Sequence, residues 1–466
     1  MNIEFKKIGP NKYQLSKTAQ MRVEAVVYST PELLKTISQD LSLKQLQEAA
    51  SLPQVVSPVI GMPDIHQGFG LPIGGVMATQ GLISVGAVGM DINCGVRLLS
   101  SGLSYNQKDF SSEKLKKLVK QIEKLIPLGL GKKHKKSYHL DLKKITEEGV
   151  KYLVNRQYAL PQDLARIEEN GQMKEANFQA LTPKAKKRAQ NQLGTLGSGN
   201  HFIEIQKIDQ VFDSSTASAW GLAENQICLM IHSGSRALGH QTCTDFTDIF
   251  WKSKDKYGLN IPRKGLAALP IKSKEGQRYF AAMAASVNFA FSNRAMMTYF
   301  IRQVFKNNFQ QQLRLIYDVA HNIAKWEVWG NKKLLIHRKG ATRALPTGHP
   351  QNPQEYEKTG HPALVPGSMG TSSYIMVGLD KNKETFYSIN HGAGRVMSRT
   401  KAKRKIQENQ FLEKMKNIVY NKPFKVIADE APQAYKNIEE VIETLVEAGL
   451  TKKIAKLTPL AVIKGD

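Results

Sequence analysis

LISVGAVGMDINCGVRLLS, residues 82–100, is the stretch that decides the fold of this chain. Two short apolar runs flank a polar turn, and runs of this length bounded by glycine predict buried strands. The segment is therefore expected to form a strand, a turn and a second strand. Asp91 and Cys94 lie three residues apart in that turn and can point at one centre. A carboxylate beside a thiolate suits a borderline transition metal, although such a pair alone is more often structural.

Three histidines occupy similar positions, each beside a strand-like run and a glycine-rich or polar turn. His201 follows Gly-Ser-Gly-Asn, His232 ends the run ICLMIH, and His321 ends the run YDVAH. Each histidine alone could be a core or turn residue whose ring is satisfied by a neighbour. Four metal-compatible loops in one chain are harder to ascribe to coincidence. Five ligands exceed the need of one tetrahedral metal, and a bridging thiolate would let them hold two.

Two further loops are typical of phosphate or nucleotide binding. His391 precedes the run Gly-Ala-Gly-Arg, where free backbone amides and a guanidinium suit a phosphate that is attacked by, or attached to, the imidazole. Residues 366–373, PGSMGTSS, offer hydroxyls and amides for a nucleotide. A glycine-rich turn with an incidental histidine is the alternative interpretation of the first loop.

The rest of the chain favours one integrated α+β domain. Residues 31–50 begin with Pro-Glu directly after Thr30 and predict a helix, and residues 275–306 predict one long helix of small and aromatic residues. Asn288 and Arg294 are polar in the apolar setting of that long helix and are expected to brace the site. Residues 107–190 are rich in lysine and predict a helical insertion with a basic surface. A solvated helix face is the commoner meaning of any one lysine run.

Composition narrows the class of partner. The net charge is +26, from 66 Lys and Arg against 40 Asp and Glu, and so large a charge attracts polyanions. Nucleic acid is the leading candidate and an anionic membrane surface the second. The chain has no run of 18 or more apolar residues, so no transmembrane helix is expected, and the N-terminus lacks the apolar core of a signal peptide. Three cysteines argue against a disulfide scaffold and for a reducing compartment.

These motifs together resemble those of RtcB, the family of tRNA-splicing RNA ligases. The resemblance runs from about residue 60 to the C-terminus and is poor in the first 25 residues and in much of 107–190. The forms DINCG and DEAPQAY are more similar to the archaeal and animal branch than to the shorter bacterial branch. The matching motifs are PDIHQGFG (63–70), DINCG (91–95), LGTLGSGNHFIE (193–204), HSGSR (232–236), DVAHN (318–322), PGSMG (366–370), NHGAGRVMSRTKAK (390–403), DEAPQAY (429–435) and VIKG (462–465).

The resemblance implies a single large α+β domain (1–466) with mixed sheets around a central metal and nucleotide cleft. It also implies two manganese ions bridged by Cys94, and a guanylylated histidine at His391. The metal ligands would be Asp91, Cys94, His201, His232 and His321. Contacts to GTP would come from Asn200, His201, Phe202, Ile203, Glu204, His321, Asn322, Pro366, Gly367, Ser368, Met369, Ser373, His391, Gly392, Ala393, Gly394, Tyr435 and Lys464. Arg236 and Arg395 would hold RNA phosphate.

The function that the resemblance implies is GTP- and manganese-dependent RNA ligation. An RNA 2′,3′-cyclic phosphate or 3′-phosphate end would be joined to a 5′-hydroxyl end through a covalent GMP–histidine, in tRNA splicing or RNA repair. The implied setting is the cytoplasm, with no membrane and with an archease-type activator as a candidate partner. The residues alone support a phosphate-binding histidine and metals. They leave open a metal-dependent RNA phosphoesterase or nuclease and a non-enzymatic RNA-binding protein.

Overall fold

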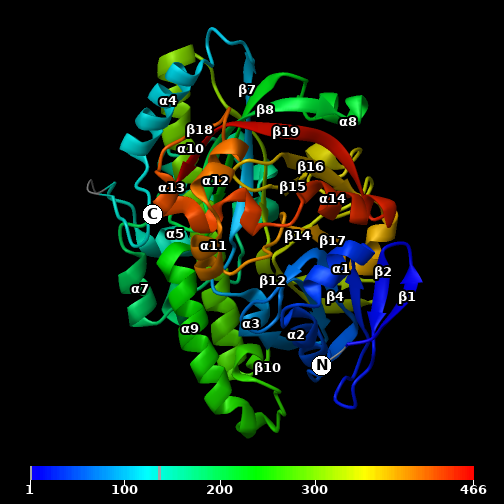
Figure 1. Ribbon diagram of the computed structural model, residues 1–466. Coiled ribbons are helices and arrows are strands. Elements are labelled where there is room, and N and C mark those ends of the chain that lie inside the picture. Colours follow the sequence, from blue (N-terminus) through cyan, green and yellow to red (C-terminus); the bar gives the residue numbers. More distant parts are fainter. Residues whose placement is uncertain (1–2, 135–137) are drawn as a thin grey trace.

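Two large sheets form the framework of the chain (Figure 1). The structure is a computed structural model that describes residues 3–134 and 138–466. The 7-stranded sheet runs in the order β1 (Phe5–Gly9), β2 (Lys12–Leu15), β3 (Ala25–Tyr28), β4 (Val55–His66), β5 (Ile73–Thr79), β13 (Lys332–Lys339) and β12 (Asn322–Trp329). The 8-stranded sheet runs in the order β11 (Arg314–Ala320), β7 (Gly95–Ser104), β9 (Gln226–Ser233), β8 (Phe202–Val211), β19 (Thr451–Lys464), β16 (Ser373–Gly378) and β15 (Ala363–Val365), and β18 (Val419–Tyr420) pairs with β19.

Two short strand pairs complete the β structure. They are β6 (Leu82–Ser84) with β10 (Ala268–Pro270), and β14 (Ala341–Arg343) with β17 (Ser388–Asn390). The helices are α1 (Pro31–Ile37), α2 (Ser42–Ala49), α3 (Val85–Val88), α4 (Ser112–Leu125), α5 (Leu142–Glu148), α6 (Val150–Asn155), α7 (Pro183–Ala189), α8 (Ser214–Ala219), α9 (Arg236–Ser253), α10 (Lys274–Phe309), α11 (Arg399–Lys405), α12 (Glu408–Lys414), α13 (Phe424–Ile427) and α14 (Ile438–Glu447). Of the helices in the described residues, none is long and apolar enough to cross a membrane.

The two sheets meet at one histidine. Strand β11 of the 8-stranded sheet ends at Ala320, and β12 of the 7-stranded sheet begins at Asn322. The peptide of His321 between them is held on both sides, because its N–H donates to Cys94 O at 2.9 Å and its carbonyl accepts from Ala341 N at 3.2 Å. A side chain at this junction therefore faces the space between the sheets.

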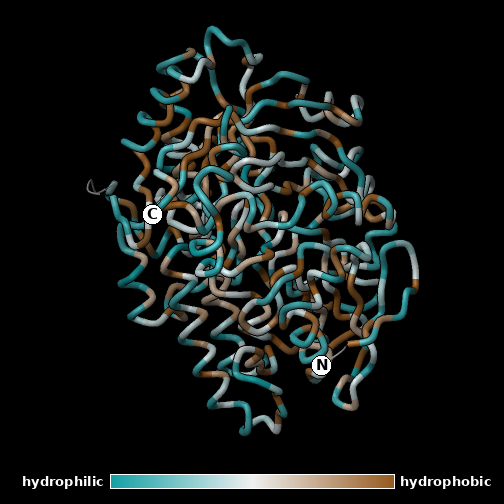
Figure 2. Tube along the Cα trace, viewed as in Figure 1, coloured by the Kyte–Doolittle hydropathy of each residue, from teal (hydrophilic) through white to brown (hydrophobic). Residues whose placement is uncertain are grey.

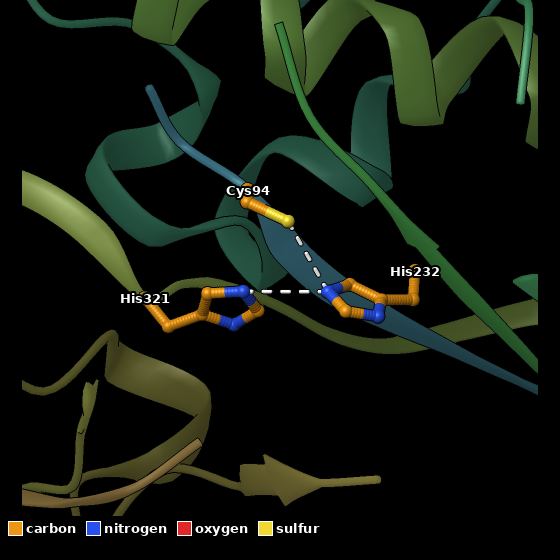
Figure 3. A group of neighbouring side chains, drawn as sticks. All are labelled: Cys94, His232 and His321. Atoms are coloured by element: carbon orange, nitrogen blue, oxygen red, sulfur yellow. Dashed lines mark hydrogen bonds between the residues drawn. The ribbon is translucent and has the colours of Figure 1, made fainter. Parts of the chain in front are cut away.

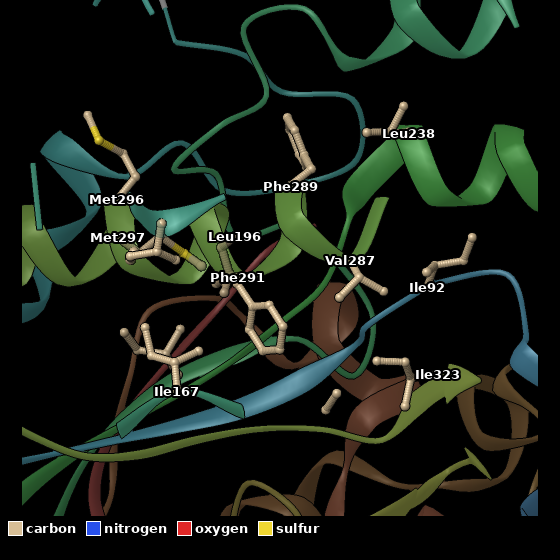
Figure 4. Close-up of a cluster of buried hydrophobic side chains, with 14 of the residues drawn as sticks. Ile92, Ile167, Leu196, Leu238, Val287, Phe289, Phe291, Met296, Met297 and Ile323 are labelled. Carbon is tan, nitrogen blue, oxygen red and sulfur yellow. The ribbon is translucent and has the colours of Figure 1, made fainter. Parts of the chain in front are cut away.

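The long helix α10 fills the centre of the main core. Ser273 caps its start, because the Oγ accepts the N–H of Gly276 at 3.0 Å, and Gln310 ends it in a left-handed conformation (φ 54°). Its apolar residues, including Phe289 and Phe291, pack against strands of the 8-stranded sheet and neighbouring helices (Figure 4). The hydropathy of the chain follows this arrangement, with apolar segments gathered inside and polar ones along the outer helices (Figure 2).

The lysine-rich segment 107–190 is built mainly of short helices; α4, α5 and α6 pack against α10, and α7 packs against α9. Asn288 of α10 anchors the segment, because it accepts from Met173 N at 2.7 Å and donates to Thr146 O at 2.9 Å. Residues 135–137 of its basic run lie outside the described part of the chain. The described part of this segment is therefore packed into the same core as the sheets.

Two local expectations need correction. Residues 31–50 form two helices instead of one, since the chain breaks at Ser38–Leu41 and Asp40 Oδ1 accepts the N–H of Ser42 at 2.7 Å. Residues 82–100 do form strand, turn and strand, but the short helix α3 occupies the start of the turn. The long helix predicted at 275–306 is confirmed as α10.

Candidate active site between the two sheets

A cleft of about 830 Å³ opens where the sheets meet. One wall belongs to the 7-stranded sheet and its connections, with His66, Phe69 and Lys339. Another wall belongs to the 8-stranded sheet and the loops around it, with Phe202, Met369 and Lys464. His232 and His321 line the cleft together with His391, which makes the cleft the candidate active site.

Five side chains, which we call the donor cluster, converge at the floor of the cleft; Asp91, Cys94, His232 and His321 line it, and His201 lies just behind them. Cys94 Sγ lies 3.4 Å from His201 Nε2 and 3.2 Å from His232 Nε2. His232 Nε2 lies 3.3 Å from His321 Nε2 (Figure 3). His201 Nε2 lies 2.8 Å from Asp91 Oδ2. The donor atoms fall into two groups, and Cys94 belongs to both.

The protonation states of the donor cluster suit metal binding. Burial, and next to it the positive charge of neighbouring groups, lowers the pKa of His232 and of His321 well below the usual range, so both rings are neutral. Burial raises the pKa of Asp91, but the hydrogen bond and charge of His201 outweigh it and bring that pKa to about 2. Neutral imidazoles and an ionised carboxylate are the forms that bind metal.

The donor set also has the chemistry of a metal site, because its imidazole, thiol and carboxylate donor atoms form two groups, in each of which the atoms lie within 4.8 Å of one another. Burial, and then the carboxylate of Asp91, raises the pKa of Cys94 well above that of a free thiol. A metal ion would reverse that shift, because a coordinated thiol loses its proton. The residues present therefore fit a divalent metal by the chemistry of their donor atoms.

Backbone contacts orient the donor cluster. His201 Nδ1 donates to Leu196 O at 3.0 Å, which directs Nε2 toward Asp91 and Cys94. Gly234 leaves the space for the Asp91 carboxylate, since a Cβ at that position would lie 2.4 Å from its oxygens.

Helix α10 ties the loops of the donor cluster to one another. The buried Arg294 guanidinium donates to Asn93 O at 2.9 Å and to Ser233 O at 2.8 Å, next to Cys94 and His232. It also pairs with Asp318 Oδ1 at 2.8 Å, on the strand that leads to His321. The expectation that Arg294 braces the site agrees with these contacts, whereas Asn288 supports the segment 107–190 instead.

A second unit stands beside the donor cluster, which we call the histidine loop (residues 390–395). Its His391 ring lies against His321, with centroids 4.9 Å apart. Asp64 Oδ2 is 2.6 Å from His391 Nδ1 and also accepts the N–H groups of His391 at 3.1 Å and Gly392 at 3.3 Å. Asp64 is fully buried on β4. The Nδ1–H is thus committed to Asp64, and Nε2 carries the free lone pair.

Lys436 holds Asp64 in place. Its buried Nζ donates to Pro63 O at 2.9 Å and to Ile65 O at 2.6 Å, the carbonyls on either side of Asp64. Its backbone N–H donates to Gly394 O at 2.9 Å. Gly394 has a φ of +73°, and a Cβ there would lie 2.2 Å from the carbonyl oxygen of Asp64, so only glycine permits this approach. The strand and the histidine loop are therefore packed as one piece.

Polar and aromatic groups gather on the wall of the 8-stranded sheet. Arg395 donates to Glu430 Oε1 at 3.2 Å and to Tyr435 Oη at 3.0 Å, and its guanidinium lies 4.9 Å from the centre of the Tyr435 ring. Lys464 Nζ lies 3.6 Å from Glu430 Oε2. Burial raises the pKa of Glu204 to about 8, partly opposed by its hydrogen bond from Gln206 and the charge of Lys464. These groups can meet a nucleotide base and its phosphates.

The structure brings nearly all of the residues predicted from sequence to the cleft. Those that line it are Asp91, Cys94, Asn200, Phe202, His232, His321, Asn322, Pro366, Gly367, Ser368, Met369, His391, Gly392, Ala393, Gly394, Arg395, Tyr435 and Lys464. His201, Glu204, Ser373 and Arg236 lie directly behind this surface, with Arg236 Nη1 3.2 Å from His201 Nδ1 and Gln206 between Glu204 and Ser373. Ile203 points to the other face of β8 and packs in the main core.

Sequence reasoning gave no role to Asp64, Glu430 or Lys436. Asp64 and Glu430 stand in the motifs PDIHQGFG and DEAPQAY, and Lys436 follows the second motif directly. Asp64 could have been noticed because it is a carboxylate inside an apolar strand. Nothing in the sequence indicated that His391 would be its partner.

Comparison with known proteins supports the assignment of these motifs. The family model for "tRNA-splicing ligase RtcB" matches residues 45–465. A tRNA-splicing ligase RtcB of Thermococcus kodakarensis is 42% identical over 481 residues, covering 99% of each chain. One of Archaeoglobus fulgidus is 43% identical and covers 100% of both chains. The RNA-splicing ligase RtcB homolog 1 of Entamoeba dispar is 41% identical over 94% of this chain and 84% of its own length.

Proposed function

Because the chain belongs to the RtcB family of tRNA-splicing ligases and is an RNA ligase, we propose that it uses GTP and two manganese ions. In this proposal the enzyme joins RNA 2′,3′-cyclic phosphate or 3′-phosphate ends to 5′-hydroxyl ends, in tRNA splicing or RNA repair. GMP is carried in between on His391. The setting is the cytoplasm, and an archease-type activator is a partner to be tested.

One observation carries the proposal: the free Nε2 of His391 beside the donor cluster. Asp64 holds Nδ1–H at 2.6 Å, which fixes the tautomer that a nucleophilic histidine needs. A nuclease using the donor cluster alone would not need a histidine held in this way. A protein that only binds RNA would need neither unit.

The first step forms the bond to GMP. His391 Nε2 attacks the α-phosphorus of GTP, an N–P bond forms, and the P–O bond to the departing pyrophosphate breaks. The imidazole gains positive charge as the bond forms, and the Asp64 carboxylate stabilises that charge through the proton on Nδ1. The Arg395 side chain lines the cleft for the phosphates, together with Ala393 and Gly394, whose amides Asp64 does not engage.

Two further transfers complete the joining. An oxygen of the RNA 3′-phosphate attacks the phosphorus of GMP, and the N–P bond breaks to restore His391. The 5′-hydroxyl oxygen of the second strand then attacks the 3′-phosphorus, the new phosphodiester forms, and GMP leaves while the hydroxyl proton is lost. A 2′,3′-cyclic end is first opened by water to the 3′-phosphate.

In this scheme the residues of the donor cluster would hold the two ions, and Cys94 belongs to both groups of donor atoms. Bound there, manganese would neutralise phosphate charge and orient the leaving group. Asn200, Phe202, Glu204, Ser373, Tyr435 and Lys464 are proposed to hold the guanosine, and Arg236 and Arg395 the RNA phosphate. The net charge of +26 favours the approach of RNA.

The test is incubation with α-labelled GTP and manganese, followed by denaturing electrophoresis. We expect label on the wild-type chain and none on His391→Ala, because alanine cannot form the N–P bond. His240→Ala, a change at an exposed histidine of α9, is the matched control and should label fully. Label retained by His391→Ala would place the nucleophile elsewhere, and RNA cleavage without any label would favour the nuclease.

A further inference from the structure

The lysine-rich segment 107–190 places one carboxylate directly behind the junction of the two sheets. Most charged side chains of this segment are exposed, whereas Glu168 is only 1% exposed. A charge buried this fully is costly unless it is paired, so its partners show what it holds together. Glu168 belongs neither to the donor cluster nor to the histidine loop, and the steps above leave it without a role.

Glu168 holds the strand that leads into His321. Strand β11 stands at the end of the 8-stranded sheet, and Ile167 forms an isolated parallel bridge with it. The next residue, Glu168, accepts the N–H of Ala320 on its Oε2 at 2.8 Å. Ala320 directly precedes His321, whose own N–H donates to Cys94 O at 2.9 Å. The peptide nitrogens of Ala320 and His321 are therefore bound in turn by the Glu168 carboxylate and by the Cys94 carbonyl.

The same carboxylate holds the strand that leaves His321. Glu168 Oε1 pairs with the Nζ of Lys325 on β12 and lies 3.4 Å from Arg343 Nε on β14. The side chains of Lys325 and Arg343 are buried with it, at 4% and 6% exposure. One side chain thus joins β11 of the 8-stranded sheet to β12 of the 7-stranded sheet, and His321 stands between these two strands.

The charges around Glu168 keep it ionised. Burial would raise its pKa, but the charges of Lys325 and Arg343 outweigh burial and lower the pKa below its usual range. Glu169 supplies a second anion, with its Oε1 2.8 Å from Lys325 Nζ and 3.7 Å from Arg343 Nη1. Two carboxylates therefore face two cations, and none of the four charges is left without a partner.

The backbone of the segment turns sharply to present these carboxylates. Glu169 and Asn170 have φ values of 56° and 52°, in the left-handed region that residues other than glycine rarely adopt. Gly171 continues the turn with a φ of 74°. Such a conformation persists only where surrounding contacts determine it, and it gathers at sites where position matters. The ion pairs with Lys325 are contacts of that kind.

We propose that Glu168 is a positioning residue for His321. By fixing both strands that flank the junction, it sets the place of His321 Nε2 relative to Cys94 Sγ and His232 Nε2. The ion affected is the one that the group of Cys94, His232 and His321 would hold. The ion of the group that contains Asp91 should keep its affinity. The proposal rests on the proposed two-metal function and gives the lysine-rich segment a part in it.

The test is calorimetric titration with manganese, with a GTP analogue present, at a temperature where the variants are folded. The wild-type chain should bind two ions. Glu168→Ala should bind one of them about ten- to hundredfold more weakly, the usual cost of losing a residue that orients a metal ligand. Because Glu168 acts through His321, Glu168→Ala combined with His321→Ala should weaken that ion no further than His321→Ala alone.

Two further variants separate positioning from stability. Asp163→Ala removes another buried carboxylate of the same segment, which accepts from Arg302 of α10 at 2.6 and 2.8 Å. It should lower the thermal stability and leave both ions at wild-type affinity. Glu168→Asp keeps the charge that Lys325 and Arg343 need, so it should fold even if Glu168→Ala does not. Its shorter side chain cannot reach both strands at once, and the same ion should weaken about tenfold.

Three results would count against this account in different ways. Wild-type affinity for both ions in either Glu168 variant would overturn the positioning role. An equal loss of affinity in Asp163→Ala would overturn it too, because the effect would then be a general loosening of the segment. A wild-type chain that binds fewer than two ions would overturn the two-metal proposal beneath it, which is a distinct outcome.

Discussion

The donor cluster and the histidine loop lie side by side but are built in different ways. The donor cluster takes its side chains from strand ends and adjoining turns around the 8-stranded sheet, and Arg294 ties two of those turns together from behind. The histidine loop depends on a carboxylate 327 positions away, on a strand of the other sheet. Lys436 fixes that carboxylate through its neighbouring carbonyls.

The difference teaches that metal binding and nucleophile activation can fail separately. A change at Asp64 leaves the ligands of the donor cluster untouched, and a change at Cys94 leaves the Asp64–His391 contact in place. The cleft is thus two units that share one substrate. Substitutions at Asp64, at Cys94 and at Lys436 test this separation, and one at Glu204 tests the wall of the 8-stranded sheet.

The largest effect is expected from Asp64→Ala. Without the carboxylate, His391 loses both the tautomer that frees Nε2 and the charge that stabilises the imidazole. Attachment of GMP should fall by roughly 10³- to 10⁴-fold, the scale seen when a catalytic histidine loses its orienting aspartate. Manganese affinity, measured by calorimetric titration, should stay near that of the wild type. Loss of both properties together would show that the two units are one.

The converse change is Cys94→Ser. Serine is close in size, but its hydroxyl stays protonated near neutral pH and is a poorer bridge than a thiolate. We expect the affinity of both ions to fall by about a hundredfold or more, whereas His321→Ala should weaken one of them. The measurement is manganese stoichiometry with a GTP analogue present. Two ions bound by Cys94→Ser at wild-type affinity would reduce Cys94 to a packing residue.

Lys436→Met should give an intermediate loss confined to the histidine loop. The variant keeps the length of the side chain but not its hydrogen bonds to Pro63 O and Ile65 O, so Asp64 is held less firmly. Attachment of GMP should slow about ten- to hundredfold, with manganese affinity unchanged, and Lys436→Arg should recover part of the rate. An equal loss of thermal stability and activity in both variants would mean that Lys436 only supports the fold.

The smallest effect concerns pH and Glu204. Burial raises the pKa of this carboxyl to about 8, so it is mostly protonated at pH 7 and ionised above pH 8. Guanine offers N–H donors, which the ionised form accepts. Binding of GTP should therefore strengthen up to about tenfold from pH 7 to pH 8.5 and level off above. Glu204→Gln should remove this dependence in calorimetric titrations, and an unchanged pH profile would separate Glu204 from guanine.

Sequence alone singled out the five residues of the donor cluster, and the structure brings them together, while their role as metal ligands stays a prediction. Its members stand at the ends of short apolar runs, and strand ends at one edge of a sheet meet in space. The long helix α10 could also be predicted, because the spacing of its apolar residues is a local pattern. The break between the two helices in 31–50 was not predicted. The contact of Asp40 with Ser42, where the second helix begins, does not change the spacing of the apolar residues.

The support of His391 could not be predicted in the same way. Asp64 and Lys436 act through contacts between segments far apart in the chain, and no periodicity reports which carboxylate meets which histidine. Glu168 is a second example. It stands in the lysine-rich segment, and only the fold brings its carboxylate beside the two strands that flank His321.

The central claim is that GMP becomes bonded to Nε2 of His391. Intact-protein mass measurement after incubation with GTP and manganese, followed by peptide mapping, tests it most directly. We predict a mass increase of one GMP on the wild-type chain, located on the peptide that contains His391 and sensitive to acid as an N–P bond is. A GMP found on another residue, or none on a protein that still joins RNA, would contradict it.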